Sequence, residues 1–310
     1  MLEKLHAKFP SAQIDFLVRS GNEALLKDHP FIHECLVWYK KQHKYRNLFL
    51  LLRRIRKARY AKVINLQRFA ASGILTAFSG AGETMGFSKN PLSFLFTRSF
   101  PHLIGTKGVP GKHEVERCHA LIADFTDAQP GYPKLYPSAS DQLQVASYLG
   151  TDFITISPAS VWFTKQTPKN VWVELIRSIS DKRIFLLGAP ADMALCEEII
   201  LDAGSAFAVS LAGKLSLLQS AALMQHAVRN FTNDSAPLHL CSAMNAPVTA
   251  VFCSTIPEFG FGPLSQDAAV VQVKEDLACK PCGLHGYAAC PLGHFRCSHI
   301  DINDLAETIR

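Results

Sequence analysis

The sequence lacks several features that mark proteins other than ordinary globular ones. No run approaches the 18 or more consecutive apolar residues that a membrane-spanning helix needs, and the first ten residues contain no apolar signal-peptide core. It has no internal repeat, no low-complexity segment and no recognised nucleic-acid-binding motif. These absences predict a cytoplasmic protein that neither crosses a membrane nor binds nucleic acid.

The cysteines do not suggest a secreted disulfide framework, because their number, nine, is odd. Five of them lie among apolar neighbours, as expected for buried thiols: Cys35, Cys118, Cys196, Cys241 and Cys253. The other four, Cys279, Cys282, Cys290 and Cys297, match the ligand number of a structural zinc site. Their later spacings, seven and six residues, are not those of a standard zinc knuckle. Zinc and free or redox-active thiols both stay open, and bound zinc would stabilise the C-terminal loop rather than do chemistry.

Positive charge is concentrated in one stretch, although the net charge is only +6. Residues 40–62 carry ten basic side chains around the apolar patch at residues 48–52: Lys40, Lys41, Lys44, Arg46, Arg53, Arg54, Arg56, Lys57, Arg59 and Lys62. As a helix, this segment is basic and amphipathic. Two interpretations remain: a solvated helix face, or contact with an anionic surface such as membrane headgroups or a phosphorylated glycolipid.

Alternating strand and helix patterns predict an α/β fold. With 310 residues, 48% of them hydrophobic, the chain is long enough for two domains. In the second half we expect strands near residues 154–157, 183–188 and 247–252. Helices should begin after the N-caps Thr167 and Ser216, with another at residues 191–201. Such alternation predicts a parallel sheet with helices on both faces.

The domain boundary is expected at a change in composition. Residues 127–138 are rich in proline, glycine and polar residues, which is typical of an irregular linker. We therefore predict an N-terminal domain at residues 1–148 and a C-terminal domain at residues 149–310.

The segment TNDSAPLH at residues 232–239 predicts a helix start directly after a strand. Asp234 or Ser235 would cap the helix, and Pro237 suits its first turn. The free N–H groups and positive dipole end of such a helix favour a phosphate. Lys165 also follows a predicted strand, so both features fall at the edge where α/β sheets bind ligands. A plain capped helix is the alternative interpretation.

At these residues the chain resembles glycosyltransferase family 9, the ADP-heptose:lipopolysaccharide heptosyltransferase type. The motifs that carry the resemblance run along most of the chain: His29-Pro30, AKVINLQ at 61–67, HEVER at 113–117, SPAS at 157–160 with Trp162 and Lys165, LGAPAD at 187–192, LAGKLSL at 211–217, NDSAPLH at 233–239, CKPC at 279–282, CPLGH at 290–294 and Cys297.

The resemblance implies two Rossmann-like, doubly wound α/β domains facing a cleft, the GT-B arrangement. The N-terminal domain would bind the acceptor and the C-terminal domain the nucleotide sugar. The implied reaction transfers a heptose-like sugar from an ADP-heptose-like donor to an anionic lipopolysaccharide core-type acceptor, with inversion and without a metal or other cofactor. With the basic segment at residues 40–62, peripheral contact with the cytoplasmic face of the inner membrane stays open. The residues that match the family's donor site are Ser160, Lys165, Asp234, Ser235, Ala236 and His239.

The chemistry of these side chains fits that role. Lys165 can meet the phosphates as a point charge, and backbone N–H groups at Ser235 and Ala236 can stabilise the leaving diphosphate. His239 could contact phosphate or ribose, or pack on the helix as an ordinary histidine. We expect Asp234 to cap the helix rather than act as a base, since a carboxylate repels a diphosphate. A lysine and a helix dipole can replace a divalent ion, and no Asp-x-Asp pair lies in a suitable loop.

Some positions depart from the family pattern. Ala236 stands where glycine is expected, and Gln166-Thr167 stands where arginine and tryptophan are common. Arg229 and Asn230 interrupt a strand that should be apolar.

The N-terminal domain is expected to be incomplete. The chain opens with the end of a helix and then a strand, without the first strand, glycine-rich loop and half helix of the family, roughly 15–20 residues. The family's proposed catalytic base is an aspartate in that loop, and no residue here matches it. We therefore expect little or no transferase activity from the chain as given, and a non-catalytic remnant that binds nucleotide or glycan is the alternative function.

Overall fold

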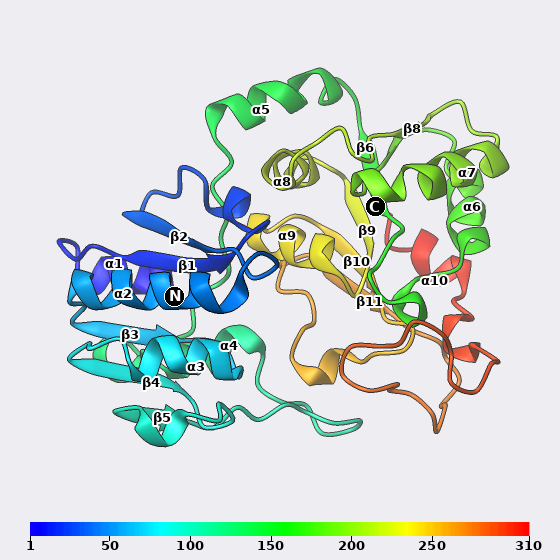
Figure 1. Cartoon of the computed structure of the whole chain (residues 1–310). Coiled ribbons are helices and arrows are strands. Elements are labelled where there is room, and N and C mark those ends of the chain that lie inside the picture. The colour runs from blue at the N-terminus through cyan, green and yellow to red at the C-terminus, as the bar shows by residue number, and fades with distance from the viewer. Residues whose placement is uncertain (310) are drawn as a thin grey trace. The chain divides into compact units, whose positions relative to one another are not determined.

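The computed structural model describes residues 1–309, which form two compact units (Figure 1). The first unit comprises Met1–Ile104 and Lys112–Gly131, and the second comprises Gly105–Gly111 and the chain from Tyr132 onward. The change of unit at Gly131 falls inside the irregular segment at residues 127–138 and before the expected domain boundary at residue 148. Among the described residues, no helix is long and apolar enough to cross a membrane.

The first unit contains four α-helices, five strands and three short 3-10 helices within its described residues. In chain order they are α1 (Leu2–Lys8), β1 (Asp15–Arg19), η1 (Glu23–Leu26), β2 (Glu34–Trp38), α2 (Lys44–Ala58), β3 (Lys62–Asn65), α3 (Ala70–Ala77), β4 (Glu83–Phe87), η2 (Ser93–Leu95), β5 (Arg98–Phe100), α4 (Glu114–Ala120) and η3 (Ala123–Phe125).

The strands of the first unit form two separate parallel sheets. One sheet has the order β1-β2 and the other β3-β4-β5. Asp15 of β1 aligns with Glu34 of β2, and Lys62 of β3 aligns with Glu83 of β4. No residue of β1 is fully buried, whereas Met85 and Phe87 of β4 are 0% exposed. The apolar side of α2 packs its Leu48, Leu51 and Ile55 into a core with Leu36 and Leu75.

The second unit is larger and alternates strands with helices along most of its length. In chain order it contains α5 (Ala139–Val145), η4 (Ala146–Tyr148), β6 (Phe153–Ser157), η5 (Phe163–Lys165), α6 (Lys169–Ser178), β7 (Arg183–Leu186), η6 (Pro190–Asp192), α7 (Met193–Ala203), β8 (Ala208–Ser210), α8 (Leu217–Gln225), β9 (Arg229–Asn233), α9 (Ala236–Met244), β10 (Val248–Val251), η7 (Pro257–Phe259), β11 (Ala268–Val271), η8 (Arg296–Ser298) and α10 (Ile302–Ala306).

One six-stranded parallel sheet organises this unit, with the order β11-β10-β9-β6-β7-β8. Helices α6, α7 and α10 cover one face, and α8 and α9 cover the other (Figure 1). Every residue of β6, β9 and β10 is buried. Since both faces are covered, near-continuous apolar strands are expected, and the predicted parallel α/β architecture is confirmed.

The two polar residues that begin β9, Arg229 and Asn230, both have hydrogen-bond partners. Arg229 is 2% exposed and forms a bidentate pair with Asp267, with N–O distances of 2.9 and 3.0 Å. Asn230 accepts a hydrogen bond from the Thr155 hydroxyl at 2.6 Å and donates to the Pro247 carbonyl at 2.8 Å. The two residues that interrupt the apolar pattern therefore have hydrogen-bond partners inside the central strand.

The predicted helix starts were correct in one case and wrong in another. Ser216 caps α8, because its side chain accepts the Gln219 N–H and Gln219 in turn accepts the Ser216 N–H. Thr167 does not cap α6, whose N-cap is Pro168. The Thr167 hydroxyl instead donates to Asn233 at 2.8 Å, which removes it from the helix start.

Candidate functional site

An ion pair joins the two segments that sequence analysis singled out. The Lys165 ammonium lies 2.7 Å from Oδ2 of Asp234, and the two side chains are 15% and 9% exposed. Lys165 ends the turn that follows β6, and Asp234 directly follows β9. Because β6 and β9 are neighbours in the sheet, their carboxyl ends bring the two residues together.

Asp234 does not cap the helix that follows it, so that prediction was wrong. Its Oδ2 accepts a hydrogen bond from the Thr255 hydroxyl at 2.6 Å in addition to the Lys165 contact. Thr255 is 1% exposed and lies beyond the end of β10, the strand on the other side of β9. Three adjacent strand ends therefore supply one buried, charge-assisted cluster of Lys165, Asp234 and Thr255.

Helix α9 begins without a side-chain cap. Ser235 occupies the N-cap position, but its hydroxyl makes no capping hydrogen bond and points instead to the Asn233 carbonyl, 3.5 Å away. Ala236 and His239 are exposed on this helix, and Pro237 falls in its first turn, as expected. Pro237 has no N–H and that of Leu238 donates to the Ser235 carbonyl at 3.1 Å, so the N–H groups of Ser235 and Ala236 are those that can face an anion at this helix start.

The loop between β6 and α6 is held in place by Asn233, which is 0% exposed. Its Oδ1 accepts hydrogen bonds from the N–H and hydroxyl of Thr167, at 2.9 and 2.8 Å, and its Nδ2 donates to the Pro158 carbonyl at 2.8 Å. Within the loop, Gln166 Nε2 donates to the Ser160 carbonyl at 2.7 Å. Ser160 therefore lies on the same fixed loop as Lys165.

A second layer of residues supports Lys165 from the C-terminal part of the chain. The Thr164 hydroxyl accepts hydrogen bonds from the Tyr287 N–H at 2.8 Å and from the Ser254 hydroxyl at 3.0 Å. A Cβ added to Gly286, whose φ is +76°, would lie 2.9 Å from Cγ of Lys165. Only glycine fits this close approach and this backbone conformation.

Sequence analysis missed Thr164, Ser254, Thr255 and the Gly286-Tyr287 pair as parts of the site. One signal was present: Ser254 and Thr255 are polar residues that come just after a buried strand, at the ligand-binding edge. The strand order that places them beside Asp234 is not visible in the sequence.

The four C-terminal cysteines are free thiols. Cys279 Sγ lies 3.9 Å from Nε2 of His294, and Cys282 Sγ lies 3.3 Å from the Cys279 carbonyl. Within residues 1–309, no group of three or more His, Cys, Asp or Glu side chains is placed to hold a metal ion. The zinc interpretation of Cys279, Cys282, Cys290 and Cys297 therefore gains no support from this arrangement.

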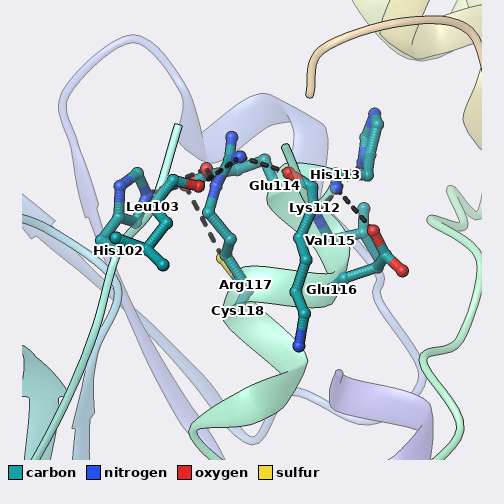
Figure 2. A network of polar contacts seen from close by, with 9 residues as sticks. All are labelled: His102, Leu103, Lys112, His113, Glu114, Val115, Glu116, Arg117 and Cys118. Carbon is teal, nitrogen blue, oxygen red and sulfur yellow. Dashed lines mark hydrogen bonds and ion pairs between the residues drawn. The ribbon is translucent and has the colours of Figure 1, made fainter. Parts of the chain in front are cut away.

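The HEVER motif of the first unit builds a different polar cluster (Figure 2). His113 caps α4 by accepting the Val115 N–H at 3.2 Å, and the Glu116 carboxylate accepts the His113 N–H at 2.5 Å. Glu114 contacts the buried His102 at 3.0 Å and the Arg117 Nε at 2.6 Å. These contacts tie the start of α4 to the segment after β5.

Arg117 is 2% exposed, and its donors are directed at protein acceptors. Besides Glu114, its Nη1 donates to the carbonyls of Leu103 and Lys112 (Figure 2). Burial alone would raise the pKa of Glu114, but hydrogen bonds from His102 and Arg117 outweigh it and hold that pKa below its ordinary value. Burial raises the pKa of the nearby Cys118 thiol to about 12. The motif therefore has a structural role in the fold of the first unit.

Comparison with known proteins agrees with the motifs and the geometry. The family model for glycosyltransferase family 9 (heptosyltransferase) matches residues 48–286. The chain belongs to glycosyltransferase family 9. Lipopolysaccharide heptosyltransferase 3 of Escherichia coli is 24% identical over 270 residues, which cover 82% of this chain and 78% of that protein. Lipopolysaccharide heptosyltransferase 1 of Pseudomonas aeruginosa is 28% identical over 292 residues, covering 88% and 78% respectively.

Solved structures show that this family 9 chain has the fold of heptosyltransferases. The structure of Escherichia coli ADP-heptose lipopolysaccharide heptosyltransferase II aligns with a TM-score of 0.75 and 21% identity, covering 99% of this chain and 91% of the other. Escherichia coli heptosyltransferase WaaC with ADP aligns with a TM-score of 0.68 and 20% identity, covering 99% and 92%. The family model and these structures agree: the chain is a glycosyltransferase of family 9 with the heptosyltransferase fold.

Proposed function

We propose that the second unit binds a nucleotide-diphosphate sugar, with the diphosphate placed against Lys165 and the first turn of α9. The observation that carries this proposal is the Lys165–Asp234 pair, 2.7 Å long, beside a helix start that has no side-chain cap. Among the described residues, Asp234 is the ion-pair partner of Lys165, so two of the three ammonium donors can turn to a ligand. Two solved structures of one relative, Escherichia coli heptosyltransferase WaaC, are described with ADP and with ADP-2-deoxy-2-fluoro heptose, which supports an ADP-heptose-like donor.

Each predicted donor-site residue has a role in this proposal. Lys165 meets the phosphates, and the backbone at Ser235 and Ala236 donates hydrogen bonds to them. His239, exposed one turn into α9, reaches phosphate or ribose. Ser160 lies on the loop that presents Lys165, and Asp234 orients the ammonium rather than removing a proton.

The reaction we propose is inverting transfer of a heptose-like sugar. The acceptor hydroxyl attacks the anomeric carbon as the bond to the diphosphate breaks, so one displacement inverts the configuration. Negative charge then develops on the leaving diphosphate, where Lys165 and the α9 dipole stabilise it more strongly than in the ground state. These two positive groups supply the charge that a divalent ion provides elsewhere, and we propose a metal-independent reaction.

Calorimetry with ADP tests the donor site. Replacing Lys165 by Ala removes a charge-assisted hydrogen bond and should weaken ADP binding by roughly 1.5–3 kcal/mol, about ten- to a hundredfold. Lys169→Ala is the matched control, because Lys169 is a nearby lysine that pairs with Asp202 at 2.9 Å on the outside of α6. Equal ADP affinity for wild type and Lys165→Ala would place the donor elsewhere.

We further propose that the first unit receives an anionic glycolipid acceptor at helix α2, at the cytoplasmic face of the inner membrane. The solvent side of α2 combines the apolar side chains Tyr45, Phe49 and Leu50, which are 76%, 60% and 49% exposed, with basic residues. Arg46, Leu50, Arg53 and Lys57 follow one another at helical spacing and form a single exposed stripe. Such a surface suits phosphorylated headgroups.

Two of the basic residues in α2 contact other residues of the first unit. Arg54 pairs with Glu34, and Arg56 donates to the Phe78 carbonyl at 3.2 Å. The test therefore uses Arg53→Glu with Lys57→Glu, which should abolish binding to phosphatidylglycerol vesicles at low salt and leave ADP affinity unchanged. The control is Lys27→Glu with Lys89→Glu, an equal charge change at exposed sites outside α2. If the control loses vesicle binding to the same degree, net charge rather than α2 is responsible.

A further inference from the structure

Residues 105–111, here called the strap, belong to the second unit, although the chain on both sides of them belongs to the first. The strap folds back on itself, because the Thr106 N–H donates to the Val109 carbonyl and the Val109 N–H to the Thr106 carbonyl, both at 2.9 Å. Reciprocal hydrogen bonds of this kind pair two antiparallel segments. The strap is therefore a defined turn with its own backbone pairing.

The first contact of the strap is with the 3-10 helix η7 (Pro257–Phe259), which follows β10. The Gly111 N–H donates to the Glu258 carbonyl at 3.0 Å. Gly105 lies against the same carbonyl, since a Cβ added to Gly105 would lie 2.0 Å from that oxygen and 2.2 Å from the Gly111 nitrogen. A side chain at position 105 would therefore separate the strap from Glu258.

The second contact of the strap is with the segment that follows β11. Lys107 Nζ donates to the Asp276 carboxylate and, at 3.1 Å, to the Leu277 carbonyl. Asp276 is 87% exposed, so this ion pair contributes little by itself. Leu277 is 5% exposed, so its carbonyl is a fixed acceptor for Lys107. Because β10 and β11 are neighbours, the strap holds together the segments that follow two adjacent strands.

The turn that the strap contacts begins with a residue of the candidate donor site. Thr255, whose hydroxyl donates to Asp234 at 2.6 Å, precedes Glu258 in this turn. Inside the turn, the Gly260 N–H donates to the Pro257 carbonyl at 2.8 Å, whereas the Glu258 carbonyl accepts its hydrogen bond from the strap. A short 3-10 turn has poor hydrogen-bond geometry of its own. Its position therefore depends on such outside contacts.

We propose that the strap is a positioning element of the donor site and acts through Thr255 on Asp234 and Lys165. This inference rests on the proposed function, since it concerns the same site. The attached strap fixes the Glu258 turn and with it Thr255. The Thr255 hydroxyl then holds the Asp234 carboxylate, which orients the Lys165 ammonium toward a diphosphate. Detaching the strap removes part of this preorganisation and weakens nucleotide binding.

The experiment compares Gly105→Ala with Gly150→Ala in the full chain. Gly150 is the matched control, because a Cβ added there has no atom within 4 Å. Gly105→Ala should raise hydrogen exchange at residues 254–260 severalfold and lower ADP affinity, measured by calorimetry, severalfold. Gly150→Ala should change neither quantity.

Lys107 offers a milder variant that leaves the backbone of the strap intact. Lys107→Ala should produce the same two changes to a smaller extent. Lys107→Arg keeps a cation that can donate to the same acceptors and should restore both values. The matched control is Lys274→Ala, because Lys274 is an exposed lysine of the same unit that pairs with Asp301 and Asp304 at 2.7 and 2.9 Å.

A double-mutant cycle separates this role from a general loss of stability. If the strap acts through Thr255, Gly105→Ala should lower ADP affinity much less in Thr255→Val protein than in wild type. Should the Gly105→Ala protein fail to fold, Lys107→Ala takes its place in the cycle.

Each contrary outcome has a definite meaning. Equal losses of ADP affinity in the two backgrounds overturn the proposal, and so does unchanged exchange at residues 254–260 in both strap variants. Equal effects of Gly105→Ala and Gly150→Ala also overturn it. If wild type fails to bind ADP, the donor-site proposal fails, and exchange at residues 254–260 still decides whether the strap fixes the turn that carries Thr255.

Discussion

The two units each contain a buried cluster of charged residues, but the clusters use their charges differently. In the first unit, the Arg117 guanidinium donates hydrogen bonds to Glu114 and to two backbone carbonyls. These bonds hold segments of the chain together. In the second unit, Lys165 pairs with Asp234 at the edge of the sheet and remains 15% exposed, beside an uncapped helix start. The planar guanidinium of arginine suits several hydrogen bonds in a fixed geometry, and the compact ammonium of lysine suits contact with a phosphate.

The sheets of the two units also differ, in how completely their strands are buried. In the second unit, the three adjacent strands β6, β9 and β10 are buried along their whole length. In the first unit, the strands form two smaller sheets, and β1 has no fully buried residue. A buried, continuous sheet can fix loops at its edge accurately, whereas less buried sheets depend more on side-chain networks such as that of Arg117.

The largest expected effect follows from breaking the Arg117 cluster. Arg117→Met leaves two carbonyls without this donor and Glu114 with His102 as its remaining partner, and should lower the free energy of unfolding by about 3–5 kcal/mol. Arg117→Lys keeps the charge but loses the fork and should cost less. Urea unfolding measures both losses, and ADP affinity of the folded Arg117→Met protein should match wild type. A loss of ADP affinity in the folded variant would show that the two clusters are not separate in role.

A smaller effect is expected from the second cluster. Thr255→Val keeps the shape of a 1% exposed side chain but removes the hydrogen bond to Asp234, which is 2.6 Å long. A hydrogen bond to a charged group contributes roughly 1.5–3 kcal/mol, so unfolding should become easier by about that amount. ADP affinity should fall severalfold because Asp234, the ion-pair partner of Lys165, loses the hydrogen bond that fixes its carboxylate. Thr255→Ser retains the hydroxyl and is the control; if it behaves like Thr255→Val, the methyl group rather than the hydrogen bond matters.

Much of the second unit could be predicted from the sequence because several of its strands, although not β9, are apolar runs. The strand at residues 247–252 and the helix after Ser216 follow from that pattern and from capping chemistry. The proximity of Lys165 and Asp234 also follows from a rule, since both come after strands of a parallel sheet. Their direct ion pair could not be predicted, because it depends on β6 and β9 being neighbours, and strand order leaves no local signal.

The errors arose where a side chain had a long-range partner that competed with a local one. Asp234 and Thr167 both have the residue type and position of an N-cap, yet Asp234 binds Lys165 and Thr255, and Thr167 binds Asn233. In the first unit, short and half-buried strands gave no clear signal that β1-β2 and β3-β4-β5 would be separate sheets. Local capping rules fail when tertiary contacts offer a charged or buried partner.

The smallest expected effect concerns the pH dependence of the Arg117 cluster. The pKa of Glu114 lies below its ordinary value because hydrogen bonds from His102 and Arg117 outweigh the cost of burial. Such a carboxylate contributes stability that is fully present above the pKa of the unfolded chain, about 4.3, and is lost as pH falls through the lower folded pKa. The slope from one group does not exceed about 1.4 kcal/mol per pH unit.

Titration of the Glu114 carboxyl by NMR measures this directly and should give a midpoint below 4.3 in the folded protein. His102→Gln removes one of the two hydrogen-bonded partners and should move the midpoint up, toward the ordinary value. Urea midpoints of wild type and His102→Gln should then converge as pH falls from 5 to 3, because protonation of Glu114 removes the difference between them. A midpoint at or above about 4.3 in wild type would mean that burial, not the hydrogen bonds from His102 and Arg117, dominates this carboxylate.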